Sequence, residues 1–122
     1  MNINIKATNI QLTPAIKEYI EKKLSSIDHK LINPNDTSAI CDVEVGKISK
    51  HHQKRDVFRA EFNLNIAGKF YRAVATQRNL YAAIDEAQDE LFRMLRSSKK
   101  KRTDITRRGM LKIKNLIRGL KW

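Results

Sequence analysis

The sequence contains little cysteine and no long apolar run, and each shortage excludes a class of protein. Cys41 is the single cysteine among 122 residues, so no disulfide can form within one chain. No apolar stretch approaches the roughly 20 residues of a membrane-spanning helix, and the first residues lack the basic and apolar pattern of a secretory signal. We therefore expect a cytoplasmic protein with one folded domain. Cys41 is expected to be a buried, unreactive thiol, with a reactive thiol as the alternative.

Residue patterns that would support catalysis or metal binding are scarce as well. The four glycines are scattered singly, so the chain has no glycine-rich phosphate loop. His51 and His52 are adjacent and would point to opposite sides of an extended segment, with no carboxylate or cysteine at metal-ligand spacing. Paired carboxylates such as Asp85 and Asp89 fit a solvated helical face. The sequence therefore predicts no catalytic residue, no metal site, no cofactor and no small-molecule substrate.

Acidic residues are nearly missing from the last quarter of the chain, and this shortage is the main functional signal. Residues 1–90 hold 13 Lys and Arg against 12 Asp and Glu, whereas residues 91–122 hold 12 against Asp104 alone. The last quarter therefore carries +11 of the net charge of +12. Such a block of like charge repels itself unless a polyanion or solvent relieves it. Nucleic acid is the first candidate partner, and an anionic membrane surface is the second.

Four segments alternate apolar and polar side chains, as strands with one buried face do. These segments are residues 2–8, 38–45, 58–66 and 69–75. Ala67-Gly68 is expected to join the last two as a tight hairpin, which makes them antiparallel. Residues 46–55 are expected to form a polar loop. Phe58 and Phe62 fall on the apolar side of their strand, where we expect core packing rather than stacking on bases.

Two further segments carry apolar residues at spacings of three and four, which is typical of a helix with one buried face. The first is expected to begin at Thr13, an N-cap followed by proline at the first helical position. The second is expected to begin at Asn79 and to carry Arg93 and Arg96 in its late turns, as the helix dipole favours. The order β-α-β-β-β-α predicts an α+β fold. We expect a two-layer sandwich in which two helices cover one face of a four-stranded mixed sheet.

The basic residues beyond the second helix fall into two segments. Residues 93–102 hold six cations and no acid, which favours phosphate contacts over a merely solvated helix end. Residues 103–122 place a narrow apolar stripe among cations, which predicts a short basic amphipathic helix. We therefore divide the chain into an α+β domain at residues 1–102 and a basic amphipathic extension at residues 103–122.

One segment resembles a known family motif. Residues 79–85, Asn-Leu-Tyr-Ala-Ala-Ile-Asp, are similar to the DMYAAID motif that opens the second helix of ribosome hibernation-promoting factors, also called ribosome-associated inhibitor A or light-repressed proteins. The resemblance covers roughly residues 1–102 and implies the same β-α-β-β-β-α fold. It also implies a non-enzymatic protein that binds the small ribosomal subunit and its rRNA under stress or in stationary phase. Such a protein occupies the channel for messenger RNA and transfer RNA, so translation stops.

The resemblance places RNA contacts on the first helix and at the end of the second, and Arg78 makes the start of the second helix more basic than in the family. The predicted RNA-binding residues are Lys22, Lys23, Lys30, Arg78, Arg93, Arg96, Lys99, Lys100, Lys101 and Arg102. Secondary RNA-binding residues are expected in the polar loop and the extension, namely Lys50, Lys54, Arg55, Arg107 and Arg108.

The C-terminal extension departs from the family pattern. The long form of the family has an additional C-terminal dimerisation domain. We do not expect that domain in residues 103–122, which follow the match, so the resemblance is to the short form. The extension is basic and amphipathic, unlike the acidic-to-neutral tail of the inhibitor A type. Whether the protein promotes ribosome dimers or keeps monomers apart therefore stays open. We expect small subunits and whole ribosomes as partners, with no DNA specificity and no membrane. The alternative is an RNA-binding or membrane-surface adaptor anchored by residues 110–122.

Overall fold

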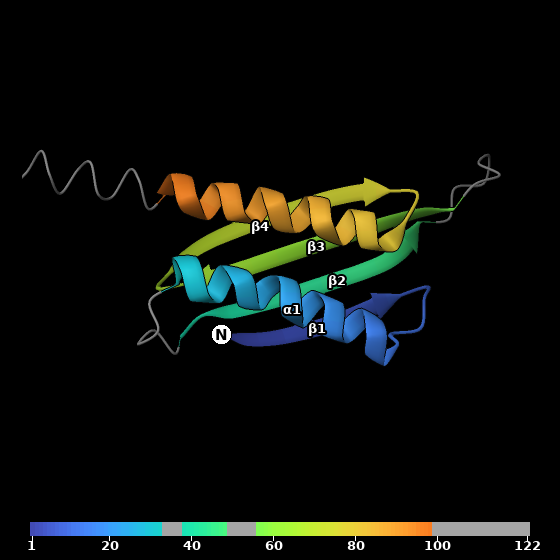
Figure 1. The fold of residues 1–122 in the computed structure, drawn as a ribbon, viewed down its shortest axis with the longest axis horizontal. Helices are drawn as coiled ribbons and strands as arrows, with labels where there is room; N and C mark the ends of the chain where they lie inside the picture. Colours follow the sequence, from blue (N-terminus) through green and yellow to red (C-terminus); the bar gives the residue numbers. More distant parts are fainter. Residues whose placement is uncertain (33–37, 49–55, 99–122) are drawn as a thin grey trace, which may run out of the picture.

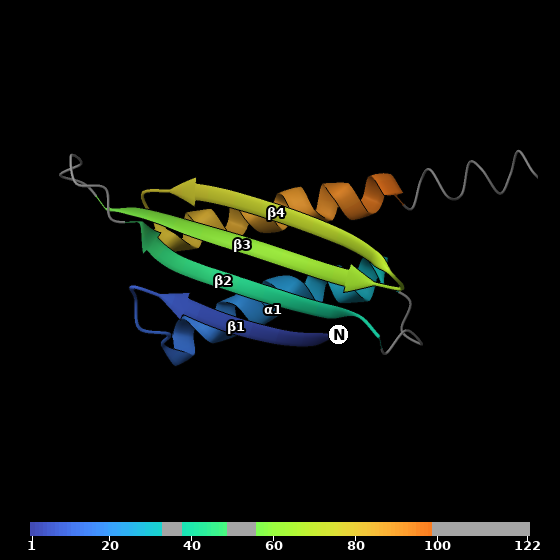
Figure 2. The same cartoon turned by 180° about the vertical axis from the view of Figure 1, so that it is seen from behind.

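The computed structural model describes residues 1–32, 38–48 and 56–98. The elements follow one another as β1 (Asn2–Thr8), α1 (Pro14–Leu31), β2 (Ile40–Ile48), β3 (Val57–Ile66) and β4 (Lys69–Gln77), followed by a second helix over residues 80–98. The strands form one sheet in the order β1-β2-β3-β4, in which β1 and β2 are parallel and the other pairs antiparallel. Both helices cover the same face of this sheet (Figure 1). Seen from behind, the other face has no helix of the described residues in front of it (Figure 2). The predicted α+β sandwich is confirmed.

Side-chain caps explain where both helices begin. The Thr13 hydroxyl oxygen accepts a hydrogen bond from the Ile16 N–H at 3.3 Å, and Pro14 has no N–H that would need a partner. At the second helix, Asn79 Oδ1 accepts a hydrogen bond from the Tyr81 N–H at 2.8 Å. Both predicted helix starts are therefore confirmed, and asparagine caps as the aspartate of the family motif would.

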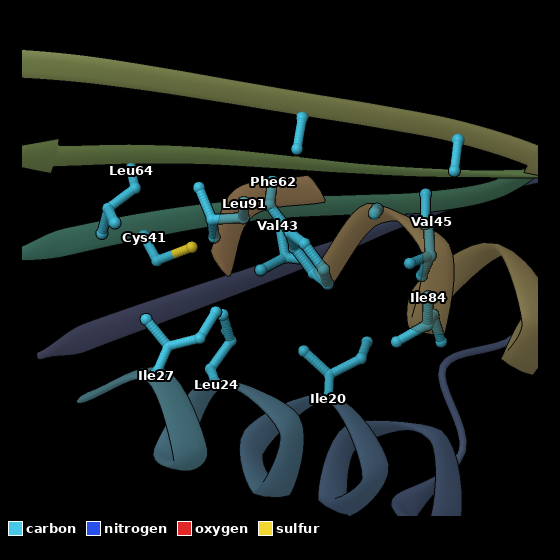
Figure 3. Packing of buried hydrophobic residues seen from close by; sticks show 14 of the residues in the cluster. Ile20, Leu24, Ile27, Cys41, Val43, Val45, Phe62, Leu64, Ile84 and Leu91 are labelled. Carbon is cyan, nitrogen blue, oxygen red and sulfur yellow. The ribbon is translucent and has the colours of Figure 1, made fainter. Parts of the chain in front are cut away.

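The apolar core lies between the sheet and the helical layer. Ile20 and Leu24 of α1 are fully buried and point toward the strands, as Figure 3 shows. Phe62 of β3 and Leu91 of the second helix are also fully buried and meet them there. Phe62 is thus a core residue, as its place in the alternating pattern predicts.

Cys41 lies in this core, on the helix-facing side of β2. Its side chain is fully buried, and it forms no disulfide. Burial and, to a lesser extent, the neighbouring Asp42 carboxylate raise the pKa of the Cys41 thiol to about 12. The thiol is therefore protonated at neutral pH, which confirms the prediction of an unreactive buried cysteine.

The prediction that residues 46–55 form a loop is wrong at its start. Gly46, Lys47 and Ile48 continue β2 and pair with β3. The glycine reflects a close approach of β1, because a Cβ at Gly46 would lie 2.6 Å from the Thr8 carbonyl oxygen. A glycine that is typical of a turn in the sequence is therefore required inside a strand. The rest of the predicted loop, residues 49–55, lies outside the described residues.

Candidate nucleic-acid interface

The two helices run in the same direction across the sheet, so their later turns lie at the same end of the molecule (Figure 1). The last turn of α1 therefore lies at the same end as residues 93–98 of the second helix. Carbonyl groups at helix C-terminal ends carry partial negative charge, which favours cationic side chains there. The fold thus gathers at one end the helix segments on which the sequence places basic residues.

Arg93 and Arg96 lie near the C-terminal end of the second helix, and we call these two arginines the basic helix end. Both arginines are exposed, and neither forms an ion pair with another residue of the described chain. Their guanidinium groups are therefore available to an anionic partner. The predicted RNA-binding residues that follow them in sequence, Lys99, Lys100, Lys101 and Arg102, lie outside the described residues.

The other predicted contacts are distributed unevenly. Lys22 is exposed on α1 and forms no ion pair within the described chain. Lys30 lies in the last turn of α1, and its side chain is outside the description. Arg78 is exposed just before the second helix, at the opposite end of that helix from Arg93. The structure therefore does not bring Arg78 together with the basic helix end.

Lys23 takes part in a contact between the two helices that the sequence did not indicate. Lys23 Nζ lies 3.2 Å from Asp85 Oδ1, and the Tyr19 hydroxyl donates a hydrogen bond to the same oxygen. The Tyr19 and Tyr81 rings meet edge to face at 4.9 Å, and Lys23 Nζ lies 5.5 Å from the Tyr19 ring centre. The bond to Asp85 is the main reason why the pKa values of Tyr19 and Lys23 are raised. Asp85 is thus an interhelical acceptor rather than a merely solvated acid, and it offsets the charge of Lys23.

The predicted secondary contacts are untested by this geometry. Lys50, Lys54, Arg55, Arg107 and Arg108 all lie outside the described residues. Near them in sequence, Lys47 is paired with Asp56 at 2.9 Å. The cation at the end of β2 is therefore partly compensated, unlike the arginines of the basic helix end.

Metal-binding clusters and membrane-spanning helices are both missing from the described ranges. In residues 1–32, 38–48 and 56–98, no three His, Cys, Asp or Glu side chains are grouped closely enough to hold one metal ion. Nor is any helix in that part of the chain long and apolar enough to cross a membrane. The most clearly built surface for a charged partner is the exposed arginine pair.

Known proteins share this fold and sequence pattern. The ribosome hibernation promotion factor of Deinococcus radiodurans is 33% identical over 98 residues, which are 78% of this chain and 47% of that protein. A factor of the same kind from Klebsiella oxytoca is 30% identical over 101 residues, which are 83% of this chain and 96% of that protein. The chain spans about half the length of the Deinococcus protein and of its Bacillus subtilis counterpart.

A solved structure and a family model agree with these relatives. The crystal structure of the Thermus thermophilus Protein Y N-terminal domain matches with a TM-score of 0.65 and 30% identity, over 78% of this chain and 96% of that one. The family model described as Sigma 54 modulation protein / S30EA ribosomal protein matches residues 3–103, which contain nearly all of the described fold. The chain therefore belongs to the Sigma 54 modulation protein / S30EA ribosomal protein family, together with curated relatives named ribosome hibernation promotion factors.

Proposed function

We propose that this chain is a ribosome hibernation factor that binds the small ribosomal subunit and occupies its channel for messenger RNA and transfer RNA. The names of its curated relatives support a ribosomal partner. Arg93 and Arg96 are exposed and form no ion pair within the described ranges, which supports contacts with rRNA phosphates. Inhibition by occupation of a channel needs no catalytic group, and association with ribosomes would place the protein in the cytoplasm.

The single observation that carries this proposal is the parallel course of the two helices. It brings the last turn of α1 and the basic helix end to one end of the domain. Six cations within residues 93–102 face no acid in that segment. A rigid helical layer that presents the exposed Lys22 of α1 and the exposed Arg93 and Arg96 of the second helix fits the regularly spaced phosphates of folded RNA. Residues 1–102 would supply this docking domain, and residues 103–122 would add cations and an apolar stripe.

Binding to purified small subunits tests the electrostatic part of the proposal. If six or more cations meet phosphates, the logarithm of affinity should fall against the logarithm of salt concentration with a slope of about −4 or steeper. A shallow slope would contradict contact through phosphates. In that case, binding to anionic vesicles would favour the membrane-surface alternative.

Two fourfold alanine variants test the location of the site. The first changes Arg93 and Arg96 of the basic helix end together with Lys99 and Lys100. The control changes Lys47, Lys50, Lys54 and Arg55, at the end of β2 and before β3. The first variant should lose more affinity for the subunit than the control, because Arg93 and Arg96 form no ion pair among the described residues whereas Lys47 is paired with Asp56. Equal losses, or a larger loss in the control, would move the site to the β2–β3 connection.

Occupation of the channel needs a separate measurement. Small subunits saturated with the protein should fail to bind a labelled messenger RNA together with initiator transfer RNA. Added messenger RNA and transfer RNA should in turn displace the labelled protein. Simultaneous binding of all three would place the protein outside the channel while leaving it a ribosome-binding protein.

A further inference from the structure

Phe70 is the most exposed large apolar residue that the structure describes, with 63% of its surface accessible. It lies near the start of β4, where Tyr71, Ala73 and Ala75 point toward the helices and Ala73 and Ala75 are buried. Successive side chains of a strand point to opposite faces, so Phe70 and Arg72 project from the face that no described helix covers (Figure 2). Phe70 is not part of the core or of the residues packed against it, so packing does not account for an aromatic ring at this position.

Four asparagines lie on the uncovered face, two on the neighbouring strand β3 and two on the opposite edge strand β1. Asn65 pairs with Phe70 in the β3–β4 register, and Asn63 pairs with Arg72. Asn2 and Asn4 lie at the same end of the sheet on β1, in register with residues of β2 that pair with Asn65 and Asn63. Asparagine is disfavoured in strands, so four of them on one face are not explained by strand stability. Their amides offer both donors and acceptors of hydrogen bonds, as the edges of nucleobases do.

The charges of this face explain why it would contact bases rather than phosphates. Three cations and three acids lie on it among the described residues, so they cancel: Lys6, Arg59, Arg72, Asp42, Glu44 and Glu61. Each acid has a partner on the same face. Asp42 accepts a hydrogen bond from Asn4, Glu44 accepts one from Thr8, and Glu61 is paired with both arginines.

The exposed ring is also close to the basic helix end. β4 is an edge strand, and the Tyr71 hydroxyl and Ser98 Oγ are hydrogen-bonded at 2.8 Å. Tyr71 therefore ties this end of β4 to the helix that carries Arg93 and Arg96, while its neighbour Phe70 projects from the other face. In both views the start of β4 lies at the same end as the later turns of the second helix (Figures 1 and 2). One RNA strand could thus meet arginines on the helical side and Phe70 around the sheet edge.

We propose that Phe70, supported by Arg72 and by Asn63 and Asn65 on the neighbouring strand, is a stacking site for an unpaired base of RNA. An aromatic ring accepts any base on its flat face, and neighbouring amides and a guanidinium group contact the base edge. The source of that RNA in the cell, rRNA of the small subunit, rests on the proposed function. The stacking site itself is a property of the sheet face, so free RNA can test it separately.

The full-length chain is the material for the test, and a labelled uridine oligomer of about 12 nucleotides is the probe. Phe70→Ser should weaken binding of the oligomer about 5- to 150-fold, the range for loss of one stacked base. Phe70→Tyr keeps the ring and should bind as the unmodified chain does. Phe70→Leu keeps the apolar character without the ring and should lose affinity as the serine variant does. Thr76→Ala, farther along the same face of β4, is the matched control and should have no effect.

Salt dependence distinguishes stacking from charge. The weaker binding of Phe70→Ser should leave the salt slope unchanged, whereas an arginine variant should make the slope shallower by about 0.7 for each phosphate that the variant no longer neutralises. No binding of the oligomer to the unmodified chain, or equal binding by Phe70→Ser, would overturn the stacking site. Binding by Phe70→Leu as tight as that of the unmodified chain would also overturn it, because an apolar side chain without a ring would then be sufficient.

The same variants measured on small subunits separate this inference from the proposed function. If the unmodified chain binds subunits and Phe70→Ser binds them and the oligomer equally well, the stacking site is wrong and the proposed function stands. If the chain fails to bind subunits but binds the oligomer through Phe70, the proposed function fails and the stacking site stands. Unchanged thermal unfolding of Phe70→Ser is expected, because the ring is exposed.

Discussion

Asp85 supplies both a hydrogen-bond acceptor between the two helices and a negative charge beside Lys23, and two substitutions separate these two contributions. Its Oδ1 accepts the hydrogen bond of the Tyr19 hydroxyl and lies 3.2 Å from Lys23 Nζ. Asp85→Asn keeps an oxygen acceptor for Tyr19 and removes the negative charge. Asp85→Ala removes both the acceptor and the charge. The asparagine variant should therefore release Lys23 while the two helices stay in contact.

The exposure of the groups sets the expected magnitudes. The Lys23 and Asp85 side chains are 35% and 43% exposed, so loss of their ion pair should cost about 1 kcal/mol or less. The Tyr19 bond is made to a charged acceptor at a part-buried position, so its loss should cost about 1.5–3 kcal/mol. Asp85→Asn also weakens the Tyr19 bond by making its acceptor neutral, so it should lower the free energy of unfolding by about 1–2 kcal/mol, and Asp85→Ala by about 2–4 kcal/mol.

Urea denaturation measures these differences, and binding to small subunits measures the released charge. If the released Lys23 neutralises a phosphate, Asp85→Asn should bind more tightly at low salt, with a slope steeper by about 0.7–0.9. Asp56→Asn removes the same charge from a different ion pair, with Lys47 at the end of β2, and serves as the control. Weaker binding of Asp85→Asn than of this control would refute the reasoning, because Asp85 would then position Lys23 rather than compete for it.

Three further predictions address the core, the sheet and the extension. Burial raises the pKa of the Cys41 thiol from 9.0 to about 12, so above pH 9 the thiol ionises in the unfolded chain but not in the fold. The free energy of unfolding should therefore be unaffected by this group below pH 9 and should fall by about 1.4 kcal/mol per pH unit from pH 9 toward pH 12. The difference in the free energy of unfolding between the unmodified chain and Cys41→Ala, measured by urea denaturation, should be constant below pH 9. Above pH 9 it should change in favour of the alanine variant. Gly46→Ala should destabilise the fold by about 1–3 kcal/mol, since its Cβ would meet the Thr8 carbonyl oxygen, and an unchanged melting temperature would contradict the close approach of the strands. Removing residues 103–122 should weaken binding to the small subunit, and unchanged affinity would exclude a role of the extension in that contact.

Features that depend on neighbouring residues in the sequence could be predicted. The caps at Thr13 and Asn79 act on N–H groups two or three positions later, so the sequence contains both partners. The alternation in β3 likewise identifies Phe62 as a core residue. Gly46 shows the limit of such reasoning. A residue without a Cβ is required there because Thr8, its register partner on β1, approaches closely. Thr8 is far away in the sequence, and the mainly polar residues that follow Gly46 predict only a turn.

The candidate site divides along the same line. The exposure of Arg93 and Arg96 follows from their place opposite the apolar stripe of their own helix. The pairing of Lys23 with Asp85 depends on how two helices far apart in sequence lie against each other, which helical spacing does not reveal. The exposure of Phe70 depends on which face of the sheet the helices cover. In β4 both faces carry an aromatic residue, so alternation alone does not assign Phe70 to the open side.

The position of the basic helix end follows from the number and direction of the strands. β1 is parallel to β2, and two antiparallel steps through β3 make β4 parallel to β1 again. Each helix follows one of these two strands and returns across the same face, so the helices must run in the same direction (Figure 1). One strand more or fewer between β1 and the second helix would reverse that helix and carry Arg93 and Arg96 to the far end from the last turn of α1. The electrostatic surface therefore depends on the topology as much as on the basic residues themselves.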